Sequence, residues 1–481
     1  MNKRPVIYWI RNDLRISDNP ALTAAVASGQ PVLPVYIWSP REEGHWAPGA
    51  ASRAWLGRSL ARLSEAYTAV GSRLILRRGD TVAVLCQLSE TTGATAVHAG
   101  RRFEPLALLQ EARVREALRT MGVTFMLHEG AVLNAPDAIE TQAGEPYKVF
   151  TPYYKACLNR EPVAMPLPAP VRLPAPGTWP ASDALASLKL APDHPWVDKV
   201  LRDWAIGEAA ARGLLESFAE SRVPDYPAHR DHPALPGTSR LSPYLHVGEI
   251  SPRQVWHAIS AYRGGRVACG SHEAYLRQLY WREFAHHLLY HFPQTPEEPL
   301  NRKFAPFPWR KDAAAMRRWQ RGQTGYPIVD AGMRELWATG WMHNRVRMIV
   351  ASFLAKDLRI HWREGANWFW DTLIDADLAN NTLGWQWVAG CGADAAPYFR
   401  VFNPVTQGKK FDPDGAYVRR WIPELAAVPD KYVHCPWTMA PIELVACGVR
   451  LGKDYPHPMV DHDEARKEAL AIYDELRALA R

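Results

Sequence analysis

The chain has 481 residues, which is enough for roughly two to four domains of ordinary size. Apolar residues make up 47% of it and charged residues 22%, a globular profile that excludes collagen-like and disordered chains. Lysine and arginine number 57 against 50 aspartate and glutamate, and the net charge of +7 mildly favours polyanionic partners.

The first 130 residues alternate short apolar runs with helix-length amphipathic segments, as βαβ units do. Helices are expected from near Ser52 and over Pro105–Met121, where apolar residues recur about every four positions. The strands are predicted at Val6–Ile10, Val32–Trp38, Arg73–Arg77, Thr95–Ala99 and Val123–Leu127. The pattern predicts an α/β domain with a doubly wound parallel sheet over residues 1–130. No GxGxxG follows the first strand and no GxxxxGK[ST] occurs, so a common dinucleotide or triphosphate site is not indicated.

Residues 131–195 are predicted to form a linker between domains. Its centre, Glu161–Pro180, has proline at seven of twenty positions, which favours an extended and semi-rigid segment. From residue 196 to 481 the apolar spacing is helical, for example at Tyr275, Leu279 and Leu288. We therefore expect one large helical domain, which ends in an amphipathic helix after Asp461.

Six cysteines are scattered along the chain without a CxxC pair, so neither a disulfide scaffold nor a zinc ribbon is indicated. No HExxH occurs among the histidines, and no metal site is predicted. No segment approaches the roughly 18 apolar residues of a membrane span, and the N-terminus does not resemble a signal peptide. We expect reduced thiols, a cytoplasmic location and no contact with a membrane.

Tryptophan is concentrated in the helical part, where 11 of the 20 tryptophans lie between residues 281 and 421. Each indole can serve as core or interface area, can stack on a nucleic-acid base, or can pass electrons. Arginines interleave with these rings, notably at Arg317–Arg321, where phosphate contact and a solvated helix face are both possible. Composition does not choose between these interpretations.

Two further segments carry polar groups in a compact pattern. Asp375 and Asp377 are separated by one residue, and their surroundings favour a hydrogen-bonding role over metal binding. Gly237–Tyr244 offers three hydroxyls just before a helical pattern, which suits either a phosphate site or an ordinary helix N-cap.

Nine segments of the chain, in order, closely resemble motifs of the DNA photolyase and cryptochrome family. They are Asp13–Leu22, Gly237–Gln254, Trp281–Phe284, Thr324–Leu336, Thr339–Met348, Asp375–Asn381, Gly384–Trp387, Asp394–Pro404 and Gln407–Pro413. The resemblance implies an α/β antenna-chromophore domain, a linker, and a helical domain that binds U-shaped FAD. It further implies an enzyme that acts on UV-damaged DNA under blue light.

The resemblance assigns a set of residues to the FAD pocket. They are Tyr226, Thr238, Ser239, Arg240, Leu241, Ser242, Tyr275, Arg282, Arg347, Asp375, Asp377 and Asn381. Hydroxyls at a helix start suit the diphosphate, and Arg347 can pair with Asp375. Asn381 matches the position that faces flavin N5, where photolyases carry asparagine and plant cryptochromes an acid. The reduced cofactor, FADH−, is implied as the active form.

The family resemblance also assigns electron-transfer and DNA-binding roles. Trp385, Trp362 and Trp309 match the chain of three tryptophans that carries electrons from the surface to the photoexcited flavin. Trp281 and Trp387 match the rings that sandwich a flipped-out pyrimidine dimer. The further lesion or DNA contacts that it implies are Arg230, Gln278, Asn344, Arg345, Met348 and Gln407.

Three of these positions bear on the choice of lesion. Asn344 and Met348 stand where enzymes for (6-4) photoproducts place two histidines, which favours cyclobutane dimers as the substrate. Gln278 stands where cyclobutane enzymes usually carry a glutamate. We therefore predict a cyclobutane pyrimidine dimer photolyase, with a cryptochrome-type photoreceptor or (6-4) repair as the alternatives.

Two segments, Gly49–Leu63 and Arg101–Pro105, resemble the bacterial subgroup called class III. This subgroup implies 5,10-methenyltetrahydrofolate as an antenna chromophore, although no residues can be assigned to its site. The cysteine positions do not resemble those of the iron–sulfur branch of the family, so no cluster is expected. The protein is expected to act as a monomer.

Overall fold

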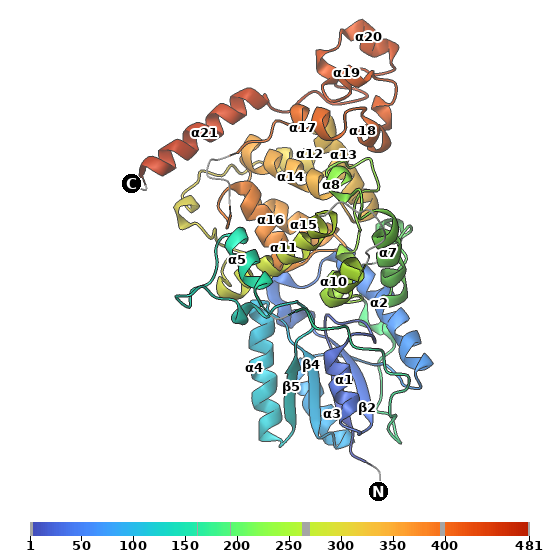
Figure 1. Cartoon of the computed structure of the whole chain (residues 1–481). Helices are drawn as coiled ribbons and strands as arrows, with labels where there is room; N and C mark the ends of the chain where they lie inside the picture. The colour runs from blue at the N-terminus through green and yellow to red at the C-terminus, as the bar shows by residue number, and fades with distance from the viewer. Residues whose placement is uncertain (1–2, 161, 193, 262–269, 395–399, 480–481) are drawn as a thin grey trace.

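The computed structural model of the chain describes residues 3–160, 162–192, 194–261, 270–394 and 400–479 (Figure 1). Three predicted features therefore lie outside the described residues. They are Cys269, Glu161 at the start of the proline-rich segment, and positions 395–399 in the centre of the Asp394–Pro404 motif.

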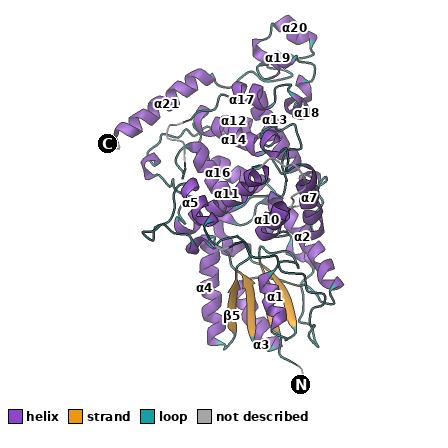
Figure 2. Cartoon of the chain, viewed as in Figure 1, coloured by secondary structure: helices purple, strands orange, loops and turns teal. Residues whose placement is uncertain are grey.

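The N-terminal domain contains the predicted parallel sheet, with strand order β3-β2-β1-β4-β5 (Figure 2). The strands are β1 (Val6–Ile10), β2 (Val32–Trp38), β3 (Ile75–Arg78), β4 (Ala96–Gly100) and β5 (Thr124–His128). β1 and β2 match their predicted bounds, and the other three start one or two residues later than predicted. Every residue of β1 and β2 is buried because helices and loops cover both faces of the sheet.

The helices of this domain begin where the sequence supplies N-terminal signals. They are α1 (Pro20–Ala27), α2 (Ala50–Ala69), α3 (Thr81–Thr92) and α4 (Pro105–Thr120). Asp80 caps α3 by accepting a hydrogen bond from the Ala83 amide, and Gly93 ends the helix in a left-handed conformation. The strand order reverses between β1 and β4, which is the place where ligands bind in open α/β sheets.

α2 reaches from the sheet domain to the helical domain. A Cβ at Gly49, just before this helix, would lie 2.1 Å from the Trp370 carbonyl oxygen, so only glycine permits this close approach. The Ser52 hydroxyl donates to the Leu373 carbonyl at 3.1 Å, and the Trp55 indole donates to Glu249 at 3.2 Å. The interface between the two domains is thus specified by buried polar contacts as well as apolar packing.

The linker is mostly extended, and its proline-rich part follows the sheet domain, whereas its α-helix packs against the helical domain. It contains α5 (Phe150–Leu158) and the short 3-10 turns at Pro136–Ala138 and Leu185–Leu188. Residues 162–180 form neither helix nor strand, as the prolines predict, and they bond to the sheet domain through backbone groups. One such bond joins the Val32 amide to the Pro174 carbonyl at 2.8 Å.

The rest of the chain is helical, with only isolated β-bridges in its described part. Its helices before residue 360 are α6 (Trp196–Val200), α7 (Glu208–Ser221), α8 (Tyr226–His229), α9 (Ser242–Val247), α10 (Pro252–Ala261), α11 (Ser271–His291), α12 (Ala313–Gln320), α13 (Pro327–Thr339) and α14 (Asn344–Ser352). The later ones are α15 (Trp362–Thr372), α16 (Leu378–Ala389), α17 (Pro404–Phe411), α18 (Ala416–Trp421), α19 (Asp430–Val433), α20 (Pro441–Ala446) and α21 (His462–Leu479).

The C-terminal helix α21 is the amphipathic helix predicted after Asp461 (Figure 1). It packs against the π-helical turn Phe353–Asp357. The buried pair of His462 and Asp357 joins the helix to this turn. Among the described residues no helix has the length and apolar character to cross a membrane. The five described cysteines are free thiols.

Candidate functional site

Two of the predicted FAD residues form an ion pair between α14 and the segment before α16. Arg347 donates to both carboxylate oxygens of Asp375, at 3.1 and 2.8 Å, which is the pairing predicted from the sequence. The Ser242 hydroxyl donates to the same carboxylate at 2.6 Å. Trp341 also belongs to this group, because its indole donates to the Ser242 hydroxyl at 3.3 Å. The pairing holds a cation, a carboxylate and a hydroxyl together.

The hydroxyl run at residues 238–242 leads directly into α9. Ser242 is the first residue of α9, and Leu241 before it makes no capping bond through its side chain. The hydroxyls therefore do not cap the helix as the N-cap interpretation would require. Ser239 instead accepts a hydrogen bond from Tyr275 at 3.0 Å. The Arg240 guanidinium lies over the ring of Trp341, 4.8 Å from its centroid, and adds positive charge beside the hydroxyls.

A second group of predicted FAD residues is aromatic and comes from α8 and α11. Tyr226 and Tyr275 meet edge to face with ring centroids 5.2 Å apart. Both rings are buried, and burial raises the pKa of each phenol, so both stay neutral. Neutral hydroxyl and apolar ring surface are suited to the uncharged part of a large cofactor.

Asp377 and Asn381 lie at the start of α16. Asp377 caps this helix by accepting from the Asn380 amide at 2.8 Å. Burial alone would raise the pKa of Asp377, but the nearby His286 and Arg282 lower it below its usual value. Asn381 donates to the Ala366 carbonyl at 3.1 Å, which fixes its side-chain amide. Arg282 donates to the Ala131 carbonyl at 2.8 Å and so joins α11 to the linker.

This donor set fits FAD. Serine and threonine hydroxyls and arginine guanidinium groups match the diphosphate, and Asp375 and Asp377 can accept from N–H and hydroxyl groups. Within the described part of the chain, the side chains of Thr238 and Gln407 make no hydrogen bond to another residue. Their predicted roles therefore have no support from protein contacts, and Leu241 contributes only a buried apolar side chain.

The three tryptophans predicted to carry electrons are arranged from the interior outward. Trp385 and Trp362 are buried, whereas Trp309 is partly exposed. The Trp385 ring packs on Gly365 of α15, where a Cβ would lie 2.0 Å from its Cη2 atom. Trp362 begins the same helix, and His361 lies between it and Trp309, with centroids 5.4 and 5.0 Å away. His361 thus joins Trp362 to the partly exposed Trp309, and the Trp385 ring packs on the helix that Trp362 begins.

The predicted lesion contacts gather at the first turn of α14 and on α11. Arg230 donates to the Gln278 carbonyl oxygen at 3.4 Å, and Gln278 itself donates to the Ala274 carbonyl. Arg345 pairs with Asp231 at 2.9 Å and also contacts the Met348 sulfur at 3.8 Å. These contacts join residues that lie far apart in the sequence.

Asn344 and the two predicted sandwich rings complete this group. Asn344 contacts the Met348 sulfur from the exposed start of α14. The Trp281 ring is half-buried, as is that of Trp387, and Trp387 donates to the Asp394 carbonyl at 3.1 Å. The structure therefore gives both indoles accessible surface together with fixed partners.

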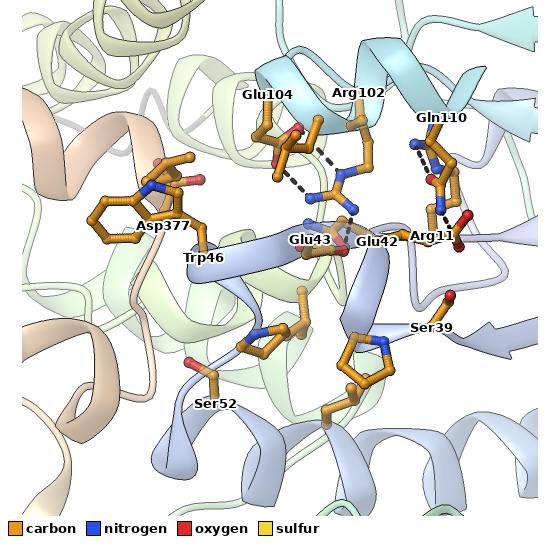
Figure 3. Close-up of a pocket in the computed structure, with 18 of the residues that line it drawn as sticks. Arg11, Ser39, Glu42, Glu43, Trp46, Ser52, Arg102, Glu104, Gln110 and Asp377 are labelled. Atoms are coloured by element: carbon orange, nitrogen blue, oxygen red, sulfur yellow. Dashed lines mark hydrogen bonds and ion pairs between the residues drawn. The ribbon is translucent and has the colours of Figure 1, made fainter. Parts of the chain in front are cut away.

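A second site, a cavity of about 330 Å³, lies between the sheet domain and the helical domain. Its size falls within the range of small-molecule sites. Trp46 and Trp370 meet edge to face at its border, with centroids 5.4 Å apart. In Figure 3, Trp46 and Asp377 lie on one side of the cavity and Arg11 and Gln110 on the other. Asp377 therefore lines this cavity in addition to its place near the predicted FAD residues.

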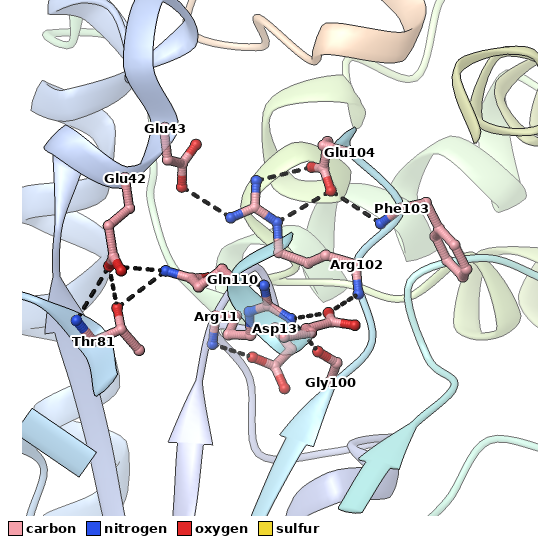
Figure 4. Close-up of polar contacts among 11 residues, drawn as sticks. Arg11, Asp13, Glu42, Glu43, Thr81, Gly100, Arg102, Phe103, Glu104 and Gln110 are labelled. Atoms are coloured by element: carbon pink, nitrogen blue, oxygen red, sulfur yellow. Dashed lines mark hydrogen bonds and ion pairs between the residues drawn. The ribbon is translucent and has the colours of Figure 1, made fainter. Parts of the chain in front are cut away.

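The polar lining of the cavity is a connected network of acids and arginine (Figure 4). Arg102 donates twice to Glu104, at 3.2 and 3.0 Å, and once to Glu43 at 2.9 Å. Burial disfavours the Glu104 carboxylate, but the Arg102 charge prevails and lowers the pKa of Glu104 well below its usual value. Glu42 accepts from Gln110 at 3.0 Å and also from Thr81. The network presents fixed negative charge beside two indoles.

Sequence reasoning assigned no residue to this cavity. The Arg101–Pro105 segment was one signal, because it contains Arg102 and Glu104. Glu42, Glu43 and Trp46 lie in a 3-10 segment, Pro40–Trp46, without a motif of their own. Trp341 was also missed as part of the FAD pocket, although it belongs to the Thr339–Met348 motif.

Comparisons with known proteins cover nearly the whole chain. Residues 6–172 match the family described as DNA photolyase, and residues 275–475 match the FAD binding domain of DNA photolyase. The chain is 47% identical to a deoxyribodipyrimidine photo-lyase of Agrobacterium fabrum, over 98% of this chain and 97% of that protein. It is 40% identical to cryptochrome-2 of Arabidopsis thaliana, over 97% of this chain and 78% of that protein. Its fold is similar to the crystal structure of a bacterial class III photolyase from Agrobacterium tumefaciens, with TM-score 0.95, 46% identity, and coverage of 99% of this chain and 98% of that one.

Proposed function

The chain belongs to the DNA photolyase family, and we propose that it repairs cyclobutane pyrimidine dimers through the pocket around Trp281, Trp387 and α14. The observation that carries this proposal is the position of that pocket. Two half-exposed indoles and the arginines Arg230 and Arg345 lie on the same helical scaffold as the Arg347–Asp375 pair. Stacking surface and phosphate-binding charge thus lie next to the predicted flavin site.

The family, the fold, the FAD-binding domain and the enzyme class predicted from the sequence are confirmed by these relatives. The assignment of individual residues is our proposal. The predicted pocket residues would hold FAD, which in its reduced, photoexcited form would supply the electron that opens the cyclobutane ring. The protein contributes a cationic surface that holds phosphate, rings that stack on the flipped bases, and a buried route for electrons.

The absence of paired histidines supports cyclobutane dimers as the substrate. Asn344 and Met348 occupy the start of α14, and neither side chain can act as an acid or base. Because the chain is also similar to a cryptochrome, a photoreceptor is the second candidate function. In a photoreceptor, flavin photoreduction through Trp385 would change partner binding.

A repair assay on defined oligonucleotides distinguishes these functions. Fully reduced protein is mixed with duplexes that carry one cyclobutane thymine dimer or one (6-4) product, with and without blue light. We expect light-dependent restoration of the cyclobutane substrate alone. Repair of the (6-4) duplex would contradict the use of Asn344 and Met348, and no repair despite flavin photoreduction would favour the photoreceptor.

The antenna predicted from the sequence, 5,10-methenyltetrahydrofolate, fits the interdomain cavity by its chemistry. The Glu42, Glu43 and Glu104 carboxylates would accept from N–H groups of its pterin ring, and their charge would favour its cationic methenyl bridge. The flat ring can stack on Trp46 or Trp370. We therefore propose that the cavity holds the folate antenna.

Reconstitution with the folate tests this assignment. We expect Trp46→Ala to lose the bound folate, seen by its near-ultraviolet absorption, while it keeps FAD and repairs DNA under light absorbed by the flavin. Trp337→Ala is the matched control, because Trp337 is a 44% exposed tryptophan of the helical domain that does not line the cavity. Folate retained by Trp46→Ala would place the antenna elsewhere, and a second flavin per chain would contradict its identity.

The domain limits 1–130, 131–195 and 196–481 and the monomeric, cytoplasmic state are part of the same proposal. The extended course of residues 162–180 supports a linker there. Limited proteolysis is expected to cut within this segment, and sedimentation is expected to give the mass of a single chain.

A further inference from the structure

The Trp281 ring, to which the proposed function assigns lesion stacking, already has a stacked partner within the chain. Phe150, the first residue of α5, lies parallel to it, with ring centroids 3.6 Å apart and an angle of 6° between the planes. Phe150 is buried, whereas Trp281 is half-buried. One face of the indole is therefore covered by Phe150, and only the other face can accept a base.

Side chains of α5 and α11 fix the position of the Phe150 ring. Tyr154, one turn later on α5, is parallel to it at 5.7 Å. The Arg277 guanidinium of α11 lies 5.2 Å from the centroids of both the Phe150 and the Tyr154 ring. Phe284 meets Phe150 edge on. With these neighbours, Phe150 cannot turn away from Trp281 without disturbing the contact between α5 and α11.

The second ring, Trp387, is connected to the same place through Asp394. Its indole donates to the Asp394 backbone carbonyl at 3.1 Å. The Asp394 carboxylate faces the Phe150 amide at the start of α5 and the Arg277 side chain. Burial raises the pKa of Asp394, while these two groups oppose the rise because they favour the carboxylate. Asp394 has a φ of +52°, a left-handed conformation that aspartate tolerates better than most residues.

We propose that Phe150 and Asp394 are positioning residues that hold Trp281 and Trp387 at the spacing a flipped pyrimidine dimer needs. Asp394 accepts from Trp387 through its carbonyl, the Phe150 amide favours its carboxylate, and Phe150 stacks on Trp281. The linker thereby connects the two walls of the lesion pocket. Rings that are fixed before binding lose little conformational entropy when the lesion stacks on them.

This inference rests on the proposed function, and it predicts a specific loss. Phe150→Leu keeps an apolar side chain but removes the parallel face, and Asp394→Ala removes the carboxylate. We expect Phe150→Leu to lower the ratio of affinities for damaged and undamaged DNA by about twofold to tenfold, which is the stacking contribution of one aromatic pair. Asp394→Ala should lower the same ratio. Asp394→Asn keeps an acceptor and tolerates the left-handed conformation, so it should restore most of the ratio.

The experiment measures dissociation constants for a duplex with one cyclobutane dimer and for the same duplex without it. The rate of FAD photoreduction is recorded in parallel, because a positioning role leaves it at the wild-type value. The matched control is Phe125→Leu, since Phe125 lies against Trp9 in the sheet domain with centroids 6.2 Å apart. It should lower the melting temperature and leave the ratio unchanged.

Two results would overturn the inference. One is a wild-type ratio in both Phe150→Leu and Asp394→Ala, and the other is an equal fall of the ratio in Phe125→Leu. If Phe150→Leu does not fold, the comparison of Asp394→Ala with Asp394→Asn carries the test. A wild-type protein that fails to prefer damaged DNA would instead refute the proposed function, which separates the two failures.

Discussion

The helical-domain pocket and the interdomain cavity are built in different ways. The pocket draws its cation, its acid and its hydroxyl from one domain, and Arg347, Asp375 and Ser242 are bonded to each other. The cavity draws Glu43 and Arg102 from the sheet domain and Asp377 and Trp370 from the helical domain. Its shape therefore depends on how the two domains dock.

This difference has a functional consequence. A pocket within one domain keeps its geometry when the neighbouring domain shifts, as electron transfer to a lesion requires. A cavity between domains can accept another chromophore by changing a few side chains at its border, while the pocket stays the same. Asp377 is the residue that borders both. Single substitutions should therefore disturb the pocket and the cavity separately.

The largest expected effect is on electron transfer in the pocket. Trp385→Phe should slow photoreduction of bound FAD by at least a hundredfold, because phenylalanine is far harder to oxidise than tryptophan. The variant should keep FAD and any ligand of the interdomain cavity. Photoreduction is followed by flavin absorption under blue light, and unchanged kinetics would refute the assigned route.

The Arg347–Asp375 pair should matter next. Asp375→Ala leaves the Arg347 charge without its partner in a mostly buried place, which costs about 3 kcal/mol or more. FAD affinity should fall by about a hundredfold, as measured by titration of the flavin-free protein. Asp371→Ala is the control, because Asp371 bonds to the Ala50 amide at the domain interface instead. Equal losses in the two variants would show that the pocket is not independent of the interface.

The interface itself should respond to pH through Glu249. Burial raises the pKa of Glu249 to about 7, although Ser59 and Trp55 of α2 both donate to it. A raised pKa means that the folded state favours the neutral acid, so this contribution is complete below about pH 4.5 and is lost as the pH rises through 7. The unfolding free energy should therefore fall by about 3 kcal/mol from this group between pH 5 and pH 8.

Glu249→Gln isolates this contribution. Glutamine can accept from Trp55 and donate to Ser59 as the neutral acid does, so the variant should lose less stability than the wild type between pH 5 and pH 8. Denaturant unfolding at both pH values provides the measurement. Glu65→Gln, which changes an exposed residue of α2, is the control and should keep the wild-type dependence. Identical slopes for Glu249→Gln and the wild type would contradict the assignment.

The two sites also differ in how far the sequence could predict them. The residues of the pocket lie in short motifs on helices, so their identity was predictable, and the Arg347–Asp375 pairing was found as expected. The cavity needs residues such as Glu43 and Trp370, which meet only when the domains dock, and no local pattern indicates that contact. The Phe150–Trp281 stack was missed for the same reason, since α5 and α11 are far apart in the sequence.

The strands illustrate the same limit at a smaller scale. Apolar runs located all five strands, because both faces of a parallel sheet must be buried. The ends of β3, β4 and β5 differ from the prediction by one or two residues, since the ladder hydrogen bonds, and not the apolar run, determine where a strand begins.

The smallest expected effect concerns Gln278, where the family resemblance predicts a glutamate in cyclobutane enzymes. Its amide donates to the Ala274 carbonyl and its carbonyl accepts from Arg230. Glutamate would keep the contact with Arg230 as an ion pair and would lose the bond to Ala274. A charged hydrogen bond is worth about 1 kcal/mol more than a neutral one, so Gln278→Glu should raise the repair yield by no more than about fivefold.

The yield per absorbed photon is measured at saturating DNA with fully reduced protein. A rise would show that the amide limits repair, and an equal or lower yield would show that glutamine is adapted to Arg230. In either case folate binding in the interdomain cavity should not change, because Gln278 does not line it.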